Sequence, residues 1–175
     1  MTRSVESVIQ ELELLKTKYN VGHIIFTDTR FTGNIEVVKE LCNVILRNKL
    51  DITWNCIGYE DMSSLTEDAL KLIKKAGCIF INVGIEAGSD KMRERIKKVG
   101  TTGDLFRKIC LIKEVGIGVT AFFMIGYPGE TRKDIKDSVR FAFSLPADTM
   151  QFEIAYPHPG TELLKYLKSK YNVKK

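Results

Sequence analysis

Residues 78–88 read CIFINVGIEAG, and the alternation within them separates an open sheet from a barrel. The odd-numbered positions are all apolar, namely Ile79, Ile81, Val83 and Ile85. The even-numbered positions are partly polar and run Phe80, Asn82, Gly84 and Glu86. A parallel strand buried on both faces of an open sheet reads as a continuous apolar run. The alternation therefore predicts a barrel strand with an outer face covered by helices and a partly polar inner face.

Two further segments alternate in the same way. In residues 149–156, TMQFEIAY, the apolar set Met150, Phe152, Ile154 and Tyr156 alternates with Thr149, Gln151, Glu153 and Ala155. In residues 51–57, DITWNCI, Thr53 and Asn55 oppose Ile52, Trp54 and Cys56. Three strands with one polar row indicate a lumen that is wet or holds a polar ligand.

Strand-like and helix-like segments alternate along the whole chain, which is typical of a parallel sheet wound by crossover helices. The expected strands are residues 23–28, 51–58, 78–88, 118–126 and 149–157. The expected helices are residues 4–19, with Ser4 as N-cap and an apolar stripe that includes Leu14, then 34–48, 65–77, 89–98, 102–116, 131–145 and one beginning near Gly160. The predicted fold class is α/β, a partial parallel (β/α) barrel, and residues 1–175 form one domain.

The composition is that of an ordinary soluble globular protein, with 44% hydrophobic and 28% charged residues. No apolar run is long enough for a membrane span, and the first residues show no signal peptide, so a cytoplasmic location is expected. The net charge is +5, but acidic residues are interleaved with the basic ones. We interpret the lysines as solvated helix faces and expect neither nucleic acid nor membrane as a partner.

Four cysteines are present, and the closest two are fourteen positions apart: Cys42, Cys56, Cys78 and Cys110. They lie within apolar periodic segments, so we expect buried thiols and no disulfides. Cys56 shares the outward parity of Trp54, and the others fall on helices or a strand start. No metal site is predicted from them.

Glycine-rich or polar loops follow every expected strand, at the end where parallel α/β folds bind ligands. They span residues 27–32, 58–61, 84–89, 126–131 and 156–161. Glycines allow a ligand to approach the backbone, and Glu86 can accept hydrogen bonds from a ribose diol or an ammonium group. Each loop by itself is better explained as an ordinary turn with a helix cap, but the set together favours a site. His23 and His158 are interpreted as structural.

At these loops the sequence resembles a known family. The segments IIFTDTRFTGN, WNCIGYED, LIKKAGCIFINVGIEAGSD, FFMIGYPGETRKDIKDSVRFA and YPHPGTEL are similar, in order, to the motifs of radical S-adenosylmethionine (SAM) enzymes. The similarity is greatest to Fe–S oxidoreductases that often have an N-terminal cobalamin-binding domain, such as anaerobic magnesium-protoporphyrin ester cyclase-like proteins. The resemblance extends over nearly the whole chain.

The resemblance implies a TIM-like partial barrel of six strands, five of them within this chain, whose first strand leads into a CxxxCxxC loop that binds a [4Fe–4S] cluster. SAM bound to the cluster is cleaved to a 5′-deoxyadenosyl radical. By the same resemblance, Glu86 contacts the ribose or amino group of SAM, with Gly88 and Ser89 beside it. The backbone at Phe123, Met124 and Gly126 and the turn at Tyr156 flank adenine, and Asp28 lies near the site mouth. A small-molecule substrate, an electron donor and, in the cobalamin-binding subgroup, cobalamin are further expected partners and cofactors.

Several positions depart from the family pattern. No CxxxCxxC occurs, Asp28-Thr29 replaces a common acidic pair, and Tyr59 stands where an arginine is common. We therefore expect the full-length protein to be a radical SAM oxidoreductase or transferase, and residues 1–175 alone to lack SAM-cleaving activity, with no catalytic residue assigned. The alternative is a cluster-less barrel that binds a nucleotide or a partner. An aldolase-like or phosphate-binding barrel enzyme is not supported, because neither a Schiff-base lysine nor a phosphate loop is evident at a strand end, and Lys97 and Lys98 are expected on a helix.

The strand at residues 23–28 is expected at the edge of the sheet. Unpaired strand edges promote association. We therefore expect self-association through this edge.

Overall fold

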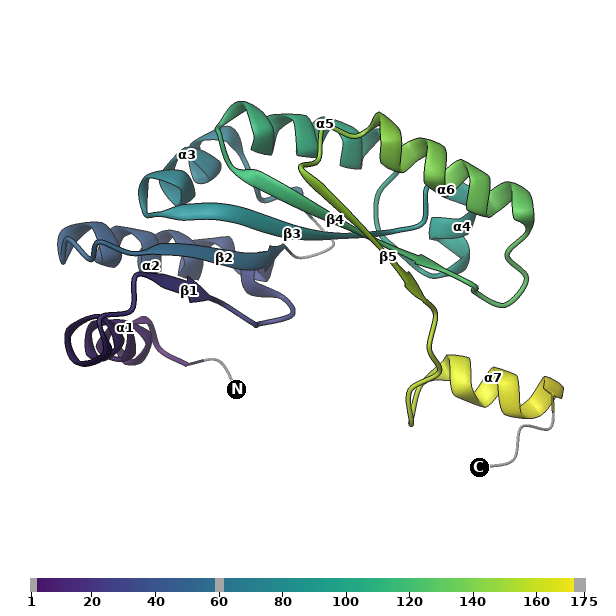
Figure 1. Cartoon of the computed structure of the whole chain (residues 1–175), viewed down its shortest axis with the longest axis horizontal. Coiled ribbons are helices and arrows are strands. Elements are labelled where there is room, and N and C mark those ends of the chain that lie inside the picture. The colour runs from purple at the N-terminus through teal and green to yellow at the C-terminus, as the bar shows by residue number, and fades with distance from the viewer. Residues whose placement is uncertain (1–2, 59–61, 172–175) are drawn as a thin grey trace.

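The centre of the molecule is a curled sheet of five parallel strands in the order β1-β2-β3-β4-β5 (Figure 1). The computed structural model describes residues 3–58 and 62–171. The strands are β1 (His23–Ile25), β2 (Thr53–Gly58), β3 (Cys78–Glu86), β4 (Gly118–Ile125) and β5 (Thr149–Ile154). Because the spatial order equals the chain order, successive crossovers run in one direction and the sheet curls into a half-barrel. The predicted partial parallel barrel is confirmed.

Helices connect the strands as the sequence predicts. They are α1 (Val5–Tyr19), α2 (Ile35–Arg47), α3 (Glu67–Lys75), α4 (Asp90–Arg95), α5 (Thr102–Glu114), α6 (Arg132–Ser144) and α7 (Glu162–Tyr171), with a 3₁₀ turn at Phe31–Gly33. Strand β1 is shorter than expected. Beyond Ile25 the backbone makes one more ladder bond, from Phe26 N to Asn55 O at 2.9 Å, before it turns into the loop.

Local capping residues define where the helices begin. Ser4 caps α1, as predicted, and accepts a hydrogen bond from the backbone N–H of Ser7. Thr101 and Thr131 form capping boxes with the acidic residue three positions later in α5 and α6. Gly77 separates α3 from β3 with φ +101°, and a Cβ there would overlap the Ile52 carbonyl oxygen. Only glycine meets both requirements at that turn.

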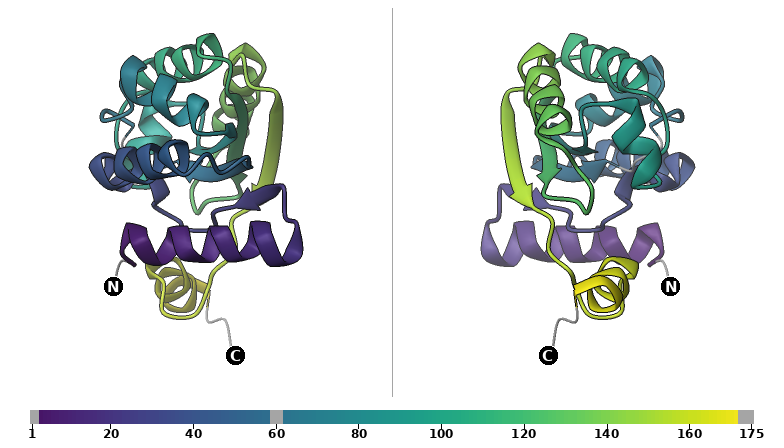
Figure 2. Two further views of the ribbon diagram at one scale, coloured as in Figure 1. Left: turned by 90° about the vertical axis from the view of Figure 1, so that its left-hand side faces the viewer. Right: turned by 90° about the vertical axis from the view of Figure 1, so that its right-hand side faces the viewer.

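The hydrophobic core lies between the sheet and the helices of its convex side, where α3, α5 and α6 run along the sheet (Figures 1 and 2). Trp54 is fully buried, and its indole N–H donates to Ala76 O at 2.8 Å. Ile81 and Val119 are also fully buried, as the predicted outward parity requires. None of the helices within the described ranges is long and apolar enough to span a bilayer.

Two predicted core positions are wrong. Ile79 is 37% exposed, because the pairing of β2 with β3 shifts register between Trp54 and Asn55 and places Cys78 opposite Trp54. Leu14 is 51% exposed, because α1 turns only Val5, Ile9 and Leu12 fully inward. The register shift is a long-range feature that strand alternation alone does not reveal.

The helices cover the last strand poorly. Strand β5 pairs only with β4, and α7 extends from its end on the side of the sheet opposite α6 (Figure 1). A 2.9 Å ion pair from Lys97 to Glu162 links the start of α7 to the segment after α4. On the outer face, Phe152 stacks on Phe123, whereas Ile154 is 77% exposed. This end of the sheet is therefore more open than the centre.

Candidate functional site

The concave face of the half-barrel presents the polar rows that the sequence predicts. The residues on this face are Thr53, Asn55 and Ile57 of β2, Phe80, Asn82 and Gly84 of β3, Thr120, Phe122 and Met124 of β4, and Thr149, Gln151 and Glu153 of β5. The register pairs Asn82 with Thr120 and Phe122 with Gln151. Most positions on β2, β3 and β4 are half-buried, whereas those on β5 are exposed. The face therefore offers hydrogen-bonding groups and apolar walls together.

Glu86 ends β3 and directs its carboxylate onto the concave face. Its backbone is left-handed, with φ 68°, at a register irregularity between β3 and β4. A Cβ on Gly84 would lie 3.0 Å from Glu86 Oε1, so the carboxylate folds back over Gly84. A left-handed conformation is unfavourable for glutamate and tends to occur at functional positions. The carboxylate of Glu86 thus lies on the concave face, and its predicted contact with a ligand stays a prediction.

Lys98 is the ionic partner of Glu86, at 3.4 Å, and the side chains are 18% and 17% exposed. The sequence reasoning placed Lys98 on a helix, which is wrong: α4 ends at Arg95. Lys97 adopts φ 60°, and the N–H of Lys98 donates to Arg93 O at 2.8 Å, as in a Schellman motif. A lysine at the position where glycine usually ends a helix hides this signal in the sequence.

Arg93 holds the segment after α4 against the end of β3. Its side chain is 2% exposed and donates to the carbonyl oxygens of Ile85 at 2.5 Å, Val99 at 2.5 Å and Gly100 at 3.0 Å. Charge-assisted hydrogen bonds of this kind are stronger than neutral ones. Arg93 thereby brings Lys98 to Glu86. Nothing in the sequence pattern distinguishes it from the solvated basic residues of α4.

Gly88 and Ser89, predicted beside the cofactor, both have contacts within the protein. The N–H of Gly88 donates to Ser138 Oγ of α6 at 2.9 Å, and a Cβ on Gly88 would lie 2.9 Å from Phe141 Cβ. Ser89 caps α4 by accepting from the N–H of Met92. The close approach that Gly88 allows is thus to α6. A cofactor contact by either residue stays a prediction.

The remaining predicted residues lie at different depths along the rim. Phe123 is opposite Glu86 in the β3–β4 register, but its side chain is buried on the outer face, so only its backbone faces the site. Met124 lies on the concave face. Gly126 has φ 86°, and its N–H already donates to Glu130 Oε2 at 2.5 Å. Glu130, missed by sequence reasoning, closes this loop.

Asp28 and Tyr156 follow the two edge strands of the sheet, β1 and β5. Both are exposed, and the Tyr156 ring contacts His158 at 5.1 Å between centroids. The predicted places of Asp28 near the site mouth and of Tyr156 beside adenine stay predictions. Of the loop after β2, residues 59–61, including Tyr59, lie outside the described residues.

The cysteines lie on the helix side of the sheet. Cys42, Cys56 and Cys78 are buried and close enough to interact, and Cys110 is half-buried. Burial, with Cys78 nearby, raises the pKa of Cys42 to about 12, and interaction with Cys56 together with burial raises the pKa of Cys78. Raised thiol pKa values oppose the thiolate form that binds iron. Within the described ranges, no group of three His, Cys, Asp or Glu side chains is arranged to hold a metal ion.

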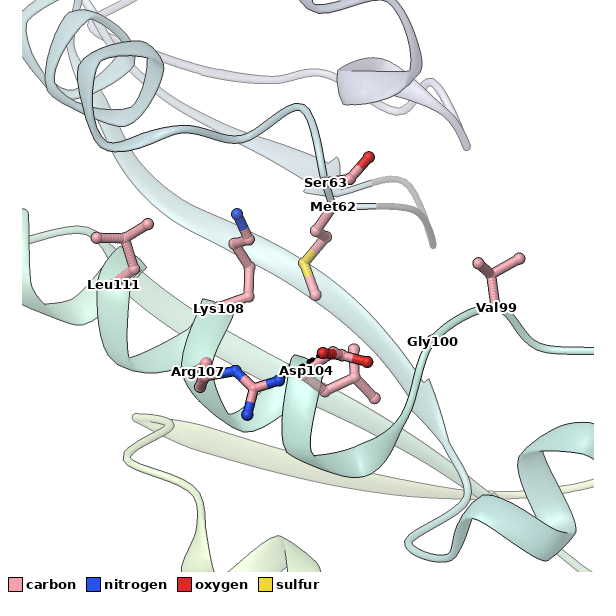
Figure 3. Close-up of a pocket in the computed structure, with 9 residues that line it drawn as sticks. Met62, Ser63, Val99, Gly100, Asp104, Arg107, Lys108 and Leu111 are labelled. Carbon is pink, nitrogen blue, oxygen red and sulfur yellow. Dashed lines mark hydrogen bonds and ion pairs between the residues drawn. The ribbon is translucent and has the colours of Figure 1, made fainter.

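A separate cavity of about 420 Å³ lies between the loop after β2 and α5 (Figure 3). It is lined by Met62, Ser63, Val99, Gly100, Asp104, Leu105, Arg107, Lys108 and Leu111. Its charged groups already have protein partners: Arg107 pairs with Asp104 at 2.6 Å, and Lys108 donates to Leu65 O at 2.7 Å. Met62 and Leu105 belong to the core of the convex side. This cavity is therefore distinct from the concave face.

Comparison with known proteins identifies the family. The profile of the Radical SAM superfamily matches residues 1–142, and the chain belongs to this superfamily. An uncharacterized methyltransferase from Pyrococcus horikoshii is 34% identical over 163 residues, covering 93% of this chain and 35% of that protein. The anaerobic magnesium-protoporphyrin IX monomethyl ester cyclase of Rubrivivax gelatinosus is 26% identical over 171 residues, covering 98% of this chain and 31% of the cyclase. The chain thus spans about a third of the length of these relatives.

Solved structures share the fold. The radical SAM methyltransferase TsrM from Kitasatospora setae, with cobalamin and a [4Fe-4S] cluster bound, superposes with a TM-score of 0.77 at 23% identity, covering 87% of this chain and 31% of TsrM. The cobalamin-dependent radical SAM enzyme OxsB gives a TM-score of 0.66 at 18% identity, covering 97% of this chain and 26% of OxsB. At this identity the likeness concerns the fold alone.

Proposed function

We propose that residues 1–175 form the SAM-binding part of a radical SAM oxidoreductase or methyltransferase. The observation that supports this best is the Glu86–Lys98 pair at the carboxyl end of β3, on the concave face. SAM has an α-ammonium group and an α-carboxylate, so a carboxylate beside an ammonium group complements both. The family membership and the named relatives agree with this assignment.

The residues of the chain fit SAM. Glu86 binds the ammonium group, and Lys98 binds the carboxylate. Arg93 fixes the segment that holds Lys98, while Phe122 and Met124 provide an apolar wall that excludes water from the same face. In this family, SAM and a reduced [4Fe–4S] cluster together supply radical chemistry. The residues of this chain bind SAM and orient it.

The residues do not fit the cluster. Three of the four cysteines are buried on the helix side, away from the concave face, with pKa values of Cys42 and Cys78 raised. The sequence of residues 1–175 contains no CxxxCxxC. We therefore propose that cluster ligands are not among these cysteines and that this stretch alone does not cleave SAM. We further propose that the full-length protein uses cobalamin, a small-molecule substrate and an electron donor, and that it is cytoplasmic.

Calorimetric titration of the chain with SAM and with 5′-methylthioadenosine tests the assignment. 5′-Methylthioadenosine lacks the amino-acid part that the charged pair would bind. We expect Glu86→Gln and Lys98→Met each to weaken SAM binding about tenfold or more while changing 5′-methylthioadenosine binding little. Glu94→Gln, on the exposed side of α4, is the matched control. Equal loss for both ligands, or no loss of SAM binding, would contradict the proposed roles.

A second candidate is a cluster-less barrel that binds a nucleotide or a partner protein, which the buried thiols also favour. Anaerobic treatment with iron and sulfide tests the inactivity of residues 1–175. A stable [4Fe–4S] absorption band together with SAM cleavage would show that this stretch holds a cluster after all. A chain that binds SAM but neither forms the band nor cleaves SAM agrees with the proposal.

A further inference from the structure

Asn82 and Thr120 form an unused polar pair in the middle of the concave face. They are directly opposite each other in the register of β3 and β4. Neighbouring strands are about 4.8 Å apart, so an amide and a hydroxyl can bind the same ligand group. Both side chains are half-buried, and neither makes a hydrogen bond to another residue of the described ranges. A half-buried polar pair without protein partners is available to a ligand or to water.

Asn55 adds an independent sign of a missing partner. Its Oδ1 atom is buried and has no hydrogen-bond partner within the described structure. In the register, Asn82 is opposite Ile57, so Asn55 is one side-chain layer deeper on the same face. Buried side-chain oxygens without a donor are uncommon in folded proteins. Two asparagines and a threonine on adjacent strands therefore share one unmet need for hydrogen bonds.

The described rows of strand side chains around Asn82 provide no cation for an anionic ligand group. None of the side chains of the concave rows, as described, is a lysine or arginine. The lysine at the rim, Lys98, is paired with Glu86, and Glu153 accepts from Gln151 at 2.5 Å. His23 contacts Thr53 at 2.9 Å at the β1 edge. A carboxylate or phosphate would be desolvated here without a cation near Asn82.

The pair lies next to the position proposed for SAM. Asn82 precedes Gly84 by two residues, and the Glu86 carboxylate lies over Gly84. Two residues of a strand span about 6.6 Å. Phe80 is one layer below Asn82, and Phe122 is one layer above Thr120, so aromatic side chains flank the polar pair. Aromatic faces favour contact with a planar ligand group, and the polar pair between the two layers offers hydrogen bonds to an amide edge.

We propose that Asn82 and Thr120, with Asn55 below, recognise an uncharged carboxamide or similar planar hydrogen-bonding group of the substrate and select against anionic substrates. The proposal deepens the proposed function and depends on it only for the placement of this group beside SAM. A carboxamide supplies both a donor and an acceptor, which asparagine and threonine side chains complement. Asn82 and Thr120 are thus specificity-determining residues of the concave face.

The test uses nicotinamide and nicotinate, which share a pyridine ring. Nicotinamide has a carboxamide group on this ring, and nicotinate has a carboxylate at the same position. Each is titrated into the ¹⁵N-labelled chain, and the side-chain amide signals of Asn55 and Asn82 are followed by NMR. We expect saturable shifts of both signals with nicotinamide and binding about tenfold weaker with nicotinate. Asn82→Leu should weaken nicotinamide about tenfold, and Thr120→Val about fivefold. Asn43→Leu, on the exposed side of α2, should not change it.

The outcomes separate cleanly. Nicotinate binding as tightly as nicotinamide, or unchanged nicotinamide binding by Asn82→Leu, would overturn the proposal. Asn82→Asp keeps the side-chain shape and should also weaken nicotinamide, which covers the case that Asn82→Leu does not fold. A SAM titration of the same samples is read separately. If the chain binds nicotinamide but not SAM, the proposed function is rejected and this inference is kept. If the chain binds SAM but not nicotinamide, this inference is rejected and the proposed function is kept.

Discussion

The contact between Gly88 and α6 allows a stability prediction worked directly from the structure. In Gly88→Ala, the new Cβ would lie 2.9 Å from both Asp137 O and Phe141 Cβ, and closer still to the Ser138 backbone. Most of these are backbone atoms of α6, so the loop and the helix must separate. Separation also lengthens the 2.9 Å bond from Gly88 N to Ser138 Oγ, which is buried.

The magnitude follows from three contributions. Overpacking of a closed contact costs about 1–3 kcal/mol. Weakening the hydrogen bond costs about 1 kcal/mol more. Alanine has less conformational entropy than glycine in the unfolded chain, which offsets about 0.4–1 kcal/mol of this destabilisation. The free energy of unfolding should therefore fall by about 1–3.6 kcal/mol, which lowers a urea midpoint by about 0.5–1.8 M if the m-value is about 2 kcal/mol per M.

Urea unfolding followed by circular dichroism is the assay, with Gly22→Ala as the matched control. A Cβ at Gly22 would have no atom within 4 Å, so this variant should not be destabilised. If Gly88→Ala unfolds within about 0.3 M urea of the wild type, with the same m-value, the loop does not pack on α6 as described. Equal destabilisation of both variants would show a general effect of replacing loop glycines.

Three further predictions concern other parts of the fold. Burial raises the pKa of Cys42 from 9.0 to about 12, so as the pH rises the thiol ionises in the unfolded chain before it ionises in the folded one. The free energy of unfolding of the wild type should therefore fall more steeply above pH 9.0 than that of Cys42→Val. Parallel curves of stability against pH for the two proteins would refute this. Sedimentation velocity should show self-association through β1 that Ile25→Lys reduces, whereas a wild-type monomer at high concentration would exclude it. Trp54→Phe, which leaves Ala76 O without its donor, should lose about 1–3 kcal/mol in urea unfolding, and an unchanged midpoint would contradict that.

Much of the fold could be read from the order of local patterns. The five strands and seven helices were predicted from alternation, capping residues and terminal glycines, each of which depends on neighbours in the chain. The polar row through Asn55 and Asn82 was predicted for the same reason, since side chains alternate strictly along a strand. Ile79 was misplaced, because a register shift against β2 interrupts the alternation that the sequence shows.

The site was predicted less completely. Glu86 could be proposed from its place after a strand, but its partner Lys98 depends on a helix end without glycine and on the buried Arg93. Gly88 could be identified as a site of close approach, but not that the approaching group is Ser138, fifty residues later. The distribution of charge over the concave face likewise required the strand register.

The sequence by itself thus determined the elements, their order and which strand face is polar, because these follow from local conformational preference and the two-residue period of a strand. Only the tertiary structure decided which polar groups meet: Asn82 with Thr120, Glu86 with Lys98, and Gly88 with Ser138. The first and third pairs join residues from different crossover units, whereas Glu86 and Lys98 are brought together by the end of α4 within one crossover. Their distances depend on register, helix ends and packing, which no local pattern specifies.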